Sequence, residues 1–357
     1  MTAASATAAP RATSSHRKAV GWWLIVIALM IAGMVVVGGL TRLTGSGLSI
    51  TQWQPVSGVI PPLNAHDWAV EFAHYKQIPQ YRLENAGMSL EQFKGIFWWE
   101  WTHRLLGRLI GLVFLLPFLY FVWRGAIGRR DIPRMVVLFA LGGLQGFVGW
   151  WMVESGLETR VSVSQYRLAI HLGVALILFV AIVWTAFEYL RPKFADATTS
   201  PLARWAKGFA GLVYIQMLLG ALVAGLHAGL IYNTWPSMDG RAFPEAPFFS
   251  QPWWINFFEN PGLVQFDHRV GAYLVALSAL TLWIAGRKMH GMARASGNAV
   301  VAIMALQIAL GITTLLLQAP IVLSALHQFT ALALLTAALW HAYELSGARA
   351  VQSPARA

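Results

Sequence analysis

The stretch "WTHRLLGRLIGLVFLLPF", residues 101–118, decides the fold, because it opens with polar side chains and continues as a largely apolar run to residue 123. About 20 such residues form a helix long enough to cross a hydrocarbon core roughly 30 Å thick. Runs of this kind recur along the chain, at 21–40, 104–123, 134–153, 168–190, 207–226, 267–286, 298–317 and 321–343. None alternates with the period of two that a barrel strand requires, and lipid admits only helices or closed barrels. The sequence therefore predicts an all-α integral membrane protein with eight transmembrane helices.

Composition supports this class. Of the 357 residues, 57% are hydrophobic and only 11% are charged, with a mean hydropathy of +0.56, values outside the range of ordinary soluble domains. The chain has no cysteine, which excludes disulfides and thiolate metal ligands.

The chain also repeats itself. "WTHRLLGRLIGLVFLLPF" is matched by "FDHRVGAYLVALSALTLW" (266–283), and "LQGFVGWWMV" (144–153) by "LQIALGITTL" (306–315). The first and fifth runs lead into "GSGLSITQW" (45–53) and "AGLIYNTWP" (228–236). His171 in the fourth run is likewise matched by His327 in the eighth, and these four matches in the same order predict two tandem, pseudo-symmetric four-helix bundles. The expected division is a cytoplasmic N-terminal tail over 1–20, a first bundle over 21–190 with a long outer loop over 44–97, a cytoplasmic linker over 191–206, a second bundle over 207–343 and a cytoplasmic tail over 344–357.

Charge sets the orientation. With the N-terminus inside, the inner segments hold 16 of the 26 Lys and Arg residues and 4 of the 15 acids, a net charge of +12, whereas the outer segments sum to −1. Basic loops stay in the cytoplasm, so both termini are expected there. The same asymmetry accounts for the pI of about 10.3, and no nucleic-acid partner is expected. The first 18 residues are rich in Ala, Ser and Thr and basic without an acid, as in a transit peptide, but no cleavage site is evident, so a short disordered cytoplasmic tail is expected instead.

Four histidines stand at the outer ends of helices that run inward, within the first turns of each: His103, His171, His268 and His327. Histidine is costly in lipid and usually faces a bundle interior. Two imidazoles in each bundle suit axial ligation of a haem iron. One alternative is that these histidines are interfacial residues bonded to backbone or headgroups. Zinc binding is disfavoured, because no third Cys, Asp or Glu ligand occurs at matching positions in the two halves. His341 is interpreted as a residue that snorkels to the inner surface.

The two halves differ three residues before the first histidine, where Glu100 stands in one and Gln265 in the other. A carboxylate there can accept protons or stabilise positive charge, which predicts that the first half hosts a reaction. The alternative is an ordinary surface salt bridge from Glu100 to Arg104. The difference also suggests that glutamine would be tolerated at position 100.

Arginines near the outer helix ends either pair with haem propionates or anchor the interface. They are Arg42, Arg104, Arg108, Arg167 and Arg269.

Over residues 20–345 the chain resembles the haem A synthase family, in its alphaproteobacterial and mitochondrial branch. The resemblance rests on "GGLTRLTGSGLSITQWQPVSGVIPP" (38–62), "WWEWTHRLLGR" (98–108), "HAGLIYNTWPSMDG" (227–240) and "QFDHRVGAY" (265–273). It implies oxidation of the C8 methyl group of haem O to a formyl group. Some members carry a cysteine pair in the first outer loop, and this chain does not.

The resemblance also assigns residues and partners. It implies that His103 and His171 flank the substrate haem with Glu100 as the carboxylate of the reaction, and that His268 and His327 bind a haem b that relays electrons. Lipid, haem O synthase and an electron-transfer protein are the implied partners, and the bacterial inner membrane is the implied location, with both haem sites near the periplasm. From the residues alone, a non-enzymatic cytochrome with two b-type haems, or a haem carrier, remains open.

Overall fold

The computed structural model describes residues 14–192 and 200–347, so much of the expected N-terminal tail, linker and C-terminal tail lies outside the described residues. Eight helices within the described residues are long and apolar enough to cross a membrane. They are α1 Ser14–Leu43, α4 Leu90–Trp123, α5 Ile132–Glu154, α6 Gln165–Leu190, α7 Pro201–Gly225, α9 Pro261–Ala285, α10 Gly291–Leu316 and α11 Ile321–Leu345. The predicted all-helical membrane class is confirmed.

Several helices begin earlier than their apolar runs. The clearest is α4, which starts at Leu90 because Ser89 and Gln92 form a reciprocal capping box there. Similarly, α1 takes in residues expected to form the N-terminal tail, and α7 takes in residues expected to form the linker. Hydropathy marks where a helix enters lipid, whereas caps mark where it begins.

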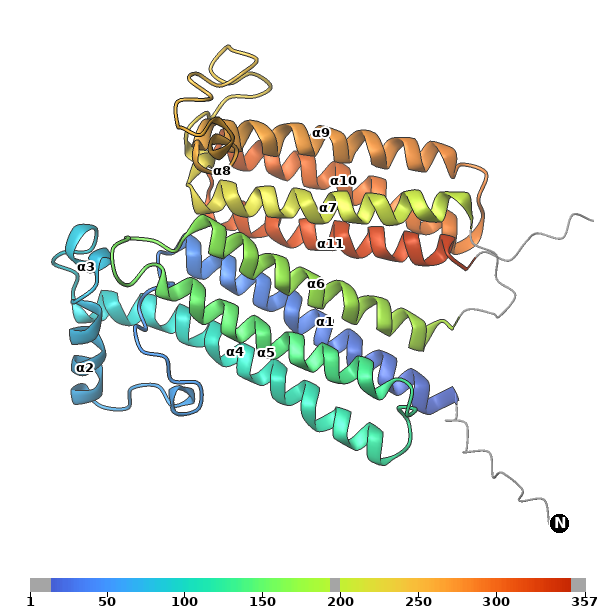
Figure 1. The fold of residues 1–357 in the computed structure, drawn as a ribbon, viewed down its shortest axis with the longest axis horizontal. Coiled ribbons are helices and arrows are strands. Elements are labelled where there is room, and N and C mark those ends of the chain that lie inside the picture. Colours follow the sequence, from blue (N-terminus) through green and yellow to red (C-terminus); the bar gives the residue numbers. More distant parts are fainter. Residues whose placement is uncertain (1–13, 193–199, 348–357) are drawn as a thin grey trace, which may run out of the picture.

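The contacts between helices form two rings (Figure 1). In one, α1 packs on α4 and α6 while α5 packs on α4 and α6; in the other, α7 packs on α9 and α11 while α10 packs on α9 and α11. Contacts of α6 with α7 and of α1 with α11 join the rings through one continuous core. The rings match the predicted halves, and their division into two separate bundles stays an interpretation of the repeat.

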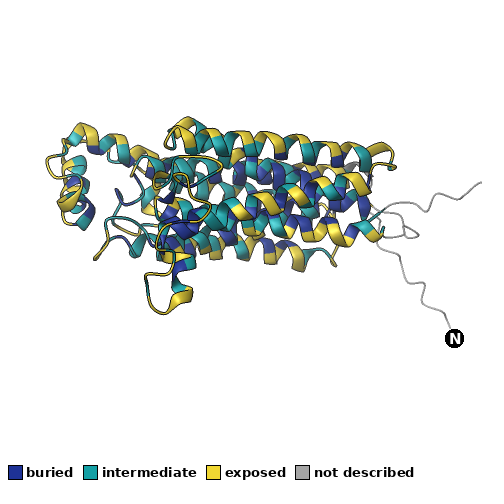
Figure 2. Cartoon of the chain, turned by 90° about the horizontal axis from the view of Figure 1, so that it is seen from above, coloured by how far each residue is buried: buried dark blue, intermediate teal, exposed yellow. Residues whose placement is uncertain are grey.

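Burial shows which helices face the surroundings (Figure 2). Within its most apolar window α6 is 44% buried, compared with 11% for α4, α5 and α10. The outward face of α4 carries an exposed apolar stripe at helical spacing: Leu112, Leu116, Leu119 and Trp123. Exposed apolar side chains of this kind need lipid around them.

The end of the molecule opposite the N-terminal start of α1 carries the larger connecting segments (Figure 1). The expected loop over 44–97 contains α2 Ala65–Tyr75, α3 Pro79–Leu83 and the first turns of α4. A second apolar cluster, which includes Leu48, Phe72, Tyr75, Phe93 and Phe97, binds these pieces together. The segment after α1 is therefore packed rather than loose. The second long connection contains the short helix α8 Asn256–Glu259.

Candidate functional site

The four histidines project from α4, α6, α9 and α11 in two pairs. The rings of His268 and His327 lie 6.5 Å apart between centroids, with their planes inclined by 77°. His103 and His171 lie within electrostatic range of each other. His171, His268 and His327 stand in the first two turns of their helices as expected, but His103 does not, because α4 starts at Leu90.

A glycine on an adjacent helix faces each imidazole. The pairs are Gly38 with His103, Gly149 with His171, Gly220 with His268 and Gly311 with His327. A Cβ atom at these glycines would come within 3.1, 2.9, 3.3 and 2.8 Å of the respective ring. A larger residue at Gly149 or Gly311 would therefore push the ring aside, and one at Gly38 or Gly220 would require the ring to move by a few tenths of an ångström.

Three of the histidines also contact a glutamine amide. Gln145 Nε2 lies 3.1 Å from His171 Nδ1, and Gln216 Nε2 lies at the same distance from His268 Nδ1. Gln307 Nε2 lies 3.4 Å from His327 Nε2. The Oε1 atoms of all three glutamines are buried without a partner, as is His327 Nδ1. Buried polar atoms of this kind call for a partner.

This donor set fits a haem iron better than a zinc ion. The imidazoles are half-buried, in apolar helices, in facing pairs. Within the described residues no cluster of three or more His, Cys, Asp or Glu could hold a metal ion, whereas zinc in proteins takes at least three such ligands. A porphyrin already supplies the equatorial nitrogens of its iron, so two imidazoles complete the coordination.

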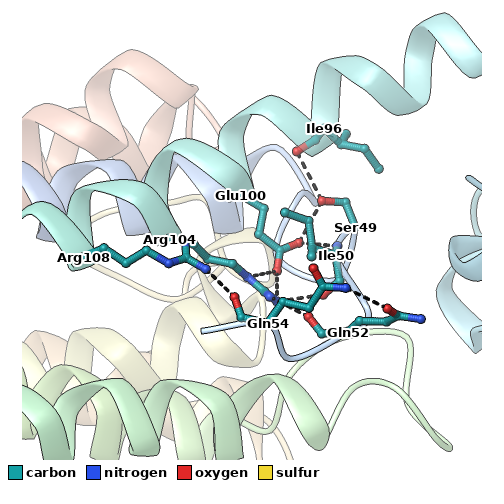
Figure 3. Close-up of polar contacts among 8 residues, drawn as sticks. All are labelled: Ser49, Ile50, Gln52, Gln54, Ile96, Glu100, Arg104 and Arg108. Atoms are coloured by element: carbon teal, nitrogen blue, oxygen red, sulfur yellow. Dashed lines mark hydrogen bonds and ion pairs between the residues drawn. The ribbon is translucent and has the colours of Figure 1, made fainter. Parts of the chain in front are cut away.

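Glu100 is 2% exposed and lies at the centre of a polar network (Figure 3). Its Oε2 accepts hydrogen bonds from Ser49 Oγ at 2.7 Å and from the Ile50 backbone N–H at 2.8 Å. Its Oε1 accepts from Arg104 Nε at 3.1 Å and from a terminal nitrogen of the same guanidinium at 2.6 Å. The salt bridge to Arg104 is thus present, but the expectation that it lies at the surface is wrong.

This network also contradicts the idea that glutamine would be tolerated at position 100. Each carboxylate oxygen faces at least one group that can only donate, the Ile50 N–H on one side and Arg104 on the other. An amide has a single acceptor oxygen, so its NH₂ group would face one of these donors.

The second half has the same hydrogen-bond arrangement, with an amide in place of the carboxylate. Gln265 Nε2 donates to the carbonyls of Ala228 and Tyr232, and its Oε1 accepts from Arg269. In each half two residues hold the outer segment that follows a membrane helix, α1 in the first half and α7 in the second. One stands three positions before the histidine, and the other is the arginine directly after it. The two halves thus share this arrangement and differ in charge, because Glu100 in the first half stands where Gln265 stands in the second.

The outer arginines bind backbone carbonyls of the outer connections and of outer helix ends. Arg104 donates to Ile50 and Gln52, and Arg108 donates to Gln54 (Figure 3). Arg108 also donates to the Pro55 carbonyl. Arg269 donates to Tyr232, Pro236 and Ser237, Arg167 to Trp151, and Arg42 to Ala224. Arg104, Arg108 and Arg269 thus anchor the outer connections, whereas Arg167 and Arg42 bind carbonyls in the last turns of α5 and α7. Arg108 and Arg269 each keep one buried nitrogen without a partner.

A cavity of about 440 Å³ lies between residues 50–63, α2 and α4. Arg104, Arg108 and Glu71 line it, and none of the four histidines does. Burial raises the pKa of Glu71, whose Oε2 has no partner. The cavity therefore adjoins the Glu100 network rather than the imidazole pairs.

His341 does not snorkel to the inner surface. It is 3% exposed, and its Nδ1 lies 2.9 Å from Ser296 Oγ. Its position fourteen residues after His327, with no partner histidine on the inner side, suggested a residue at the inner end of its helix, but α11 packs on α1, α7 and α10. It is a hydrogen-bonded core histidine.

Comparisons with known proteins agree with these features. The family model described as "Cytochrome oxidase assembly protein" matches residues 21–339. A Parvibaculum lavamentivorans protein named "Heme A synthase" is 50% identical over 334 residues, 94% of this chain and 96% of the relative. Proteins with the same name are 51% identical over 348 residues in Bradyrhizobium diazoefficiens (97% and 96%) and 52% identical over 339 residues in Rhodopseudomonas palustris (94% and 91%).

Proposed function

Because the chain belongs to the haem A synthase family, which makes haem A for cytochrome oxidase, we propose that it oxidises the C8 methyl group of haem O to a formyl group. Two successive hydroxylations at that carbon give a gem-diol, and loss of water leaves the formyl group. The first half, with Glu100, His103 and His171, is the proposed substrate site. The second half, with His268 and His327, is the proposed site of a haem b cofactor.

The observation that carries this proposal is the difference between Glu100 and Gln265 in two otherwise matching hydrogen-bond arrangements. Both halves have paired imidazoles, facing glycines and an arginine that holds the outer segment. Only the first half places a carboxylate there. A pure electron carrier has no evident use for this asymmetry, whereas a reaction that develops positive charge at one haem does.

In this proposal each side chain has a limited task. His103 and His171 bind the iron of the substrate haem and fix the porphyrin in the first half. Glu100 keeps a negative charge and holds residues 49 and 50 at the outer end of α4. All its hydrogen bonds are accepted from donors, which favours charge stabilisation and positioning over proton abstraction. Haem b, when bound in the second half, supplies one-electron redox chemistry.

Pigment analysis tests the function. Purified protein should yield haem b together with haem O, its hydroxylated form or haem A when the extracted haems are separated by chromatography. The non-enzymatic alternative gives haem b in both sites, so two equivalents of haem b and no trace of the other haems would contradict the proposal.

We further place the protein in the bacterial inner membrane with both termini in the cytoplasm and both imidazole pairs near the periplasm. The start of α1 and the end of α11 lie at one end of the molecule, and the four helices that carry the imidazoles begin at the other end (Figure 1). The inner segments carry the excess of Lys and Arg.

A reporter that is active only outside the cytoplasm, fused after Val153 near the end of α5, should therefore be active. Fusion after Trp123, the last residue of α4 at its proposed cytoplasmic end, is the matched control and should be inactive. Activity in the reverse pattern would invert the orientation.

A further inference from the structure

The glutamine and glycine that serve each histidine belong to one local motif. Gln145 stands four residues before Gly149, Gln216 four before Gly220, and Gln307 four before Gly311. Because positions i and i+4 share a helix face, each helix presents an amide and a gap to the same imidazole. Three of the four imidazole-facing helices therefore carry Gln-x-x-x-Gly.

The fourth helix breaks the motif. Four residues before Gly38, α1 carries Met34. Its side chain points the same way as Gln216, since Met34 Cε lies against Gly107 on α4 just as Gln216 Oε1 lies against Gly271 on α9. Within the described residues the His103 imidazole has no hydrogen-bond partner. His103 is thus the one imidazole without an amide.

The amides tie the imidazoles to their own backbone. Gln216 Nε2 donates to the His268 backbone carbonyl at 2.8 Å, and Gln145 Nε2 donates to that of His171 at 3.0 Å. The same amide nitrogen lies 3.1 Å from Nδ1 of the ring in both cases, so one amide group holds the backbone and the ring of the histidine in a fixed relation. Gln307 contacts the third imidazole through its amide nitrogen, which lies 3.4 Å from His327 Nε2.

We propose that Gln145, Gln216 and Gln307 are positioning residues that fix their histidines for iron binding, and that Met34 leaves His103 unfixed so that the first site can exchange its haem. The inference rests on the proposed function, because it assumes haem iron at both imidazole pairs. It gives a physical reason for one protein to hold one haem permanently and turn over another: both ligands are fixed in the second half, and only one in the first.

The reciprocal exchange Gln216→Met and Met34→Gln tests this. Haem release from the purified full-length protein is followed by transfer to excess apomyoglobin. Outer hydrogen bonds to a ligating histidine are typically worth about 10- to 100-fold in metal affinity. Gln216→Met should release haem b faster by about that factor, and Met34→Gln, loaded with haem O, should release haem O more slowly by a similar factor.

The reduction potential separates positioning from folding. Gln216 Nε2 lies 3.1 Å from His268 Nδ1, and groups that contact a ligating histidine tune the potential of its iron, so the haem b potential of Gln216→Met should move away from the parent value. Gln307→Met should repeat both effects at His327, and it replaces Gln216→Met if that variant fails to accumulate. Gln328→Met is the matched control, because Gln328 donates to the Val35 carbonyl and not to an imidazole.

Each outcome decides a separate claim. Haem b release and potential at parent values in both Gln216→Met and Gln307→Met, while His268→Ala has lost its haem, would overturn the positioning role and leave the proposed function intact. Equal effects in Gln328→Met would also overturn it. Parent-rate release of haem O from Met34→Gln would overturn the role of Met34. Haem b retained in His268→Ala would overturn the site assignment and the inference together.

Discussion

Purified His268→Ala is expected to lack the haem b signal that the parent shows in its reduced-minus-oxidised spectrum. His268 supplies one of two imidazoles in the second half, and its ring lies 6.5 Å from that of His327. Outer hydrogen bonds to such ligands already change affinity about 10- to 100-fold, so removal of the ligand itself should exceed that range. His327→Ala should lose the same signal.

His341→Ala is the control for the loss of a histidine inside the membrane. His341 lies on α11, as His327 does, and is more deeply buried, but it bonds to Ser296 and has no facing imidazole. Its replacement should leave haem b in place. An undiminished haem b signal in both His268→Ala and His327→Ala would refute the assignment of the second site, and its loss in His341→Ala alone would move that site to the inner end.

The membrane helices could be predicted from the sequence because lipid imposes one strong requirement, an apolar run of sufficient length. Their ends could not, because capping and tertiary packing extend helices beyond lipid. The capping box at Ser89 carries α4 far into the outer region, where Phe93 and Phe97 join the second apolar cluster. Hydropathy contains no record of either contact.

The candidate site divides in a similar way. The repeat was enough to single out the four histidines, since each occurs at a matching place in the two halves. The partners of Glu100 could not be inferred, because Ser49 and Ile50 lie about fifty positions away and one of them donates through its backbone. The motif at Gln216 was detectable by its spacing to Gly220, but the repeat drew attention only to Gln145 and Gln307, which share a preceding leucine.

Glu100→Gln is expected to lower the rate of haem A formation by about 100-fold or more while both imidazole pairs keep their haems. Removal of one electrostatic stabiliser or general base typically costs this much, about 2.7 kcal/mol in the barrier. Haem O or a partly oxidised haem should accumulate, and chromatography of extracted haems measures both. The amide also leaves one buried donor unpaired, so an additional loss of about 1–3 kcal/mol in stability is expected.

Ser49→Ala separates the effect of the negative charge of Glu100 from the effect of its hydrogen bonds to the outer segment. It removes one hydrogen bond from Glu100 Oε2 but leaves the carboxylate, the Ile50 N–H and Arg104 in place. Loss of one hydrogen bond to a charged group is worth about 1.5–3 kcal/mol. Because the carboxylate and its charge stay in place, we expect this loss mainly in stability, and the rate should fall far less than in Glu100→Gln. If Glu100→Gln, at matched protein levels, made haem A at the rate of Ser49→Ala or faster, the carboxylate would act only by holding the outer segment, as Gln265 does in the second half. A far larger loss in Glu100→Gln, with haem content unchanged, would assign the effect to the negative charge itself.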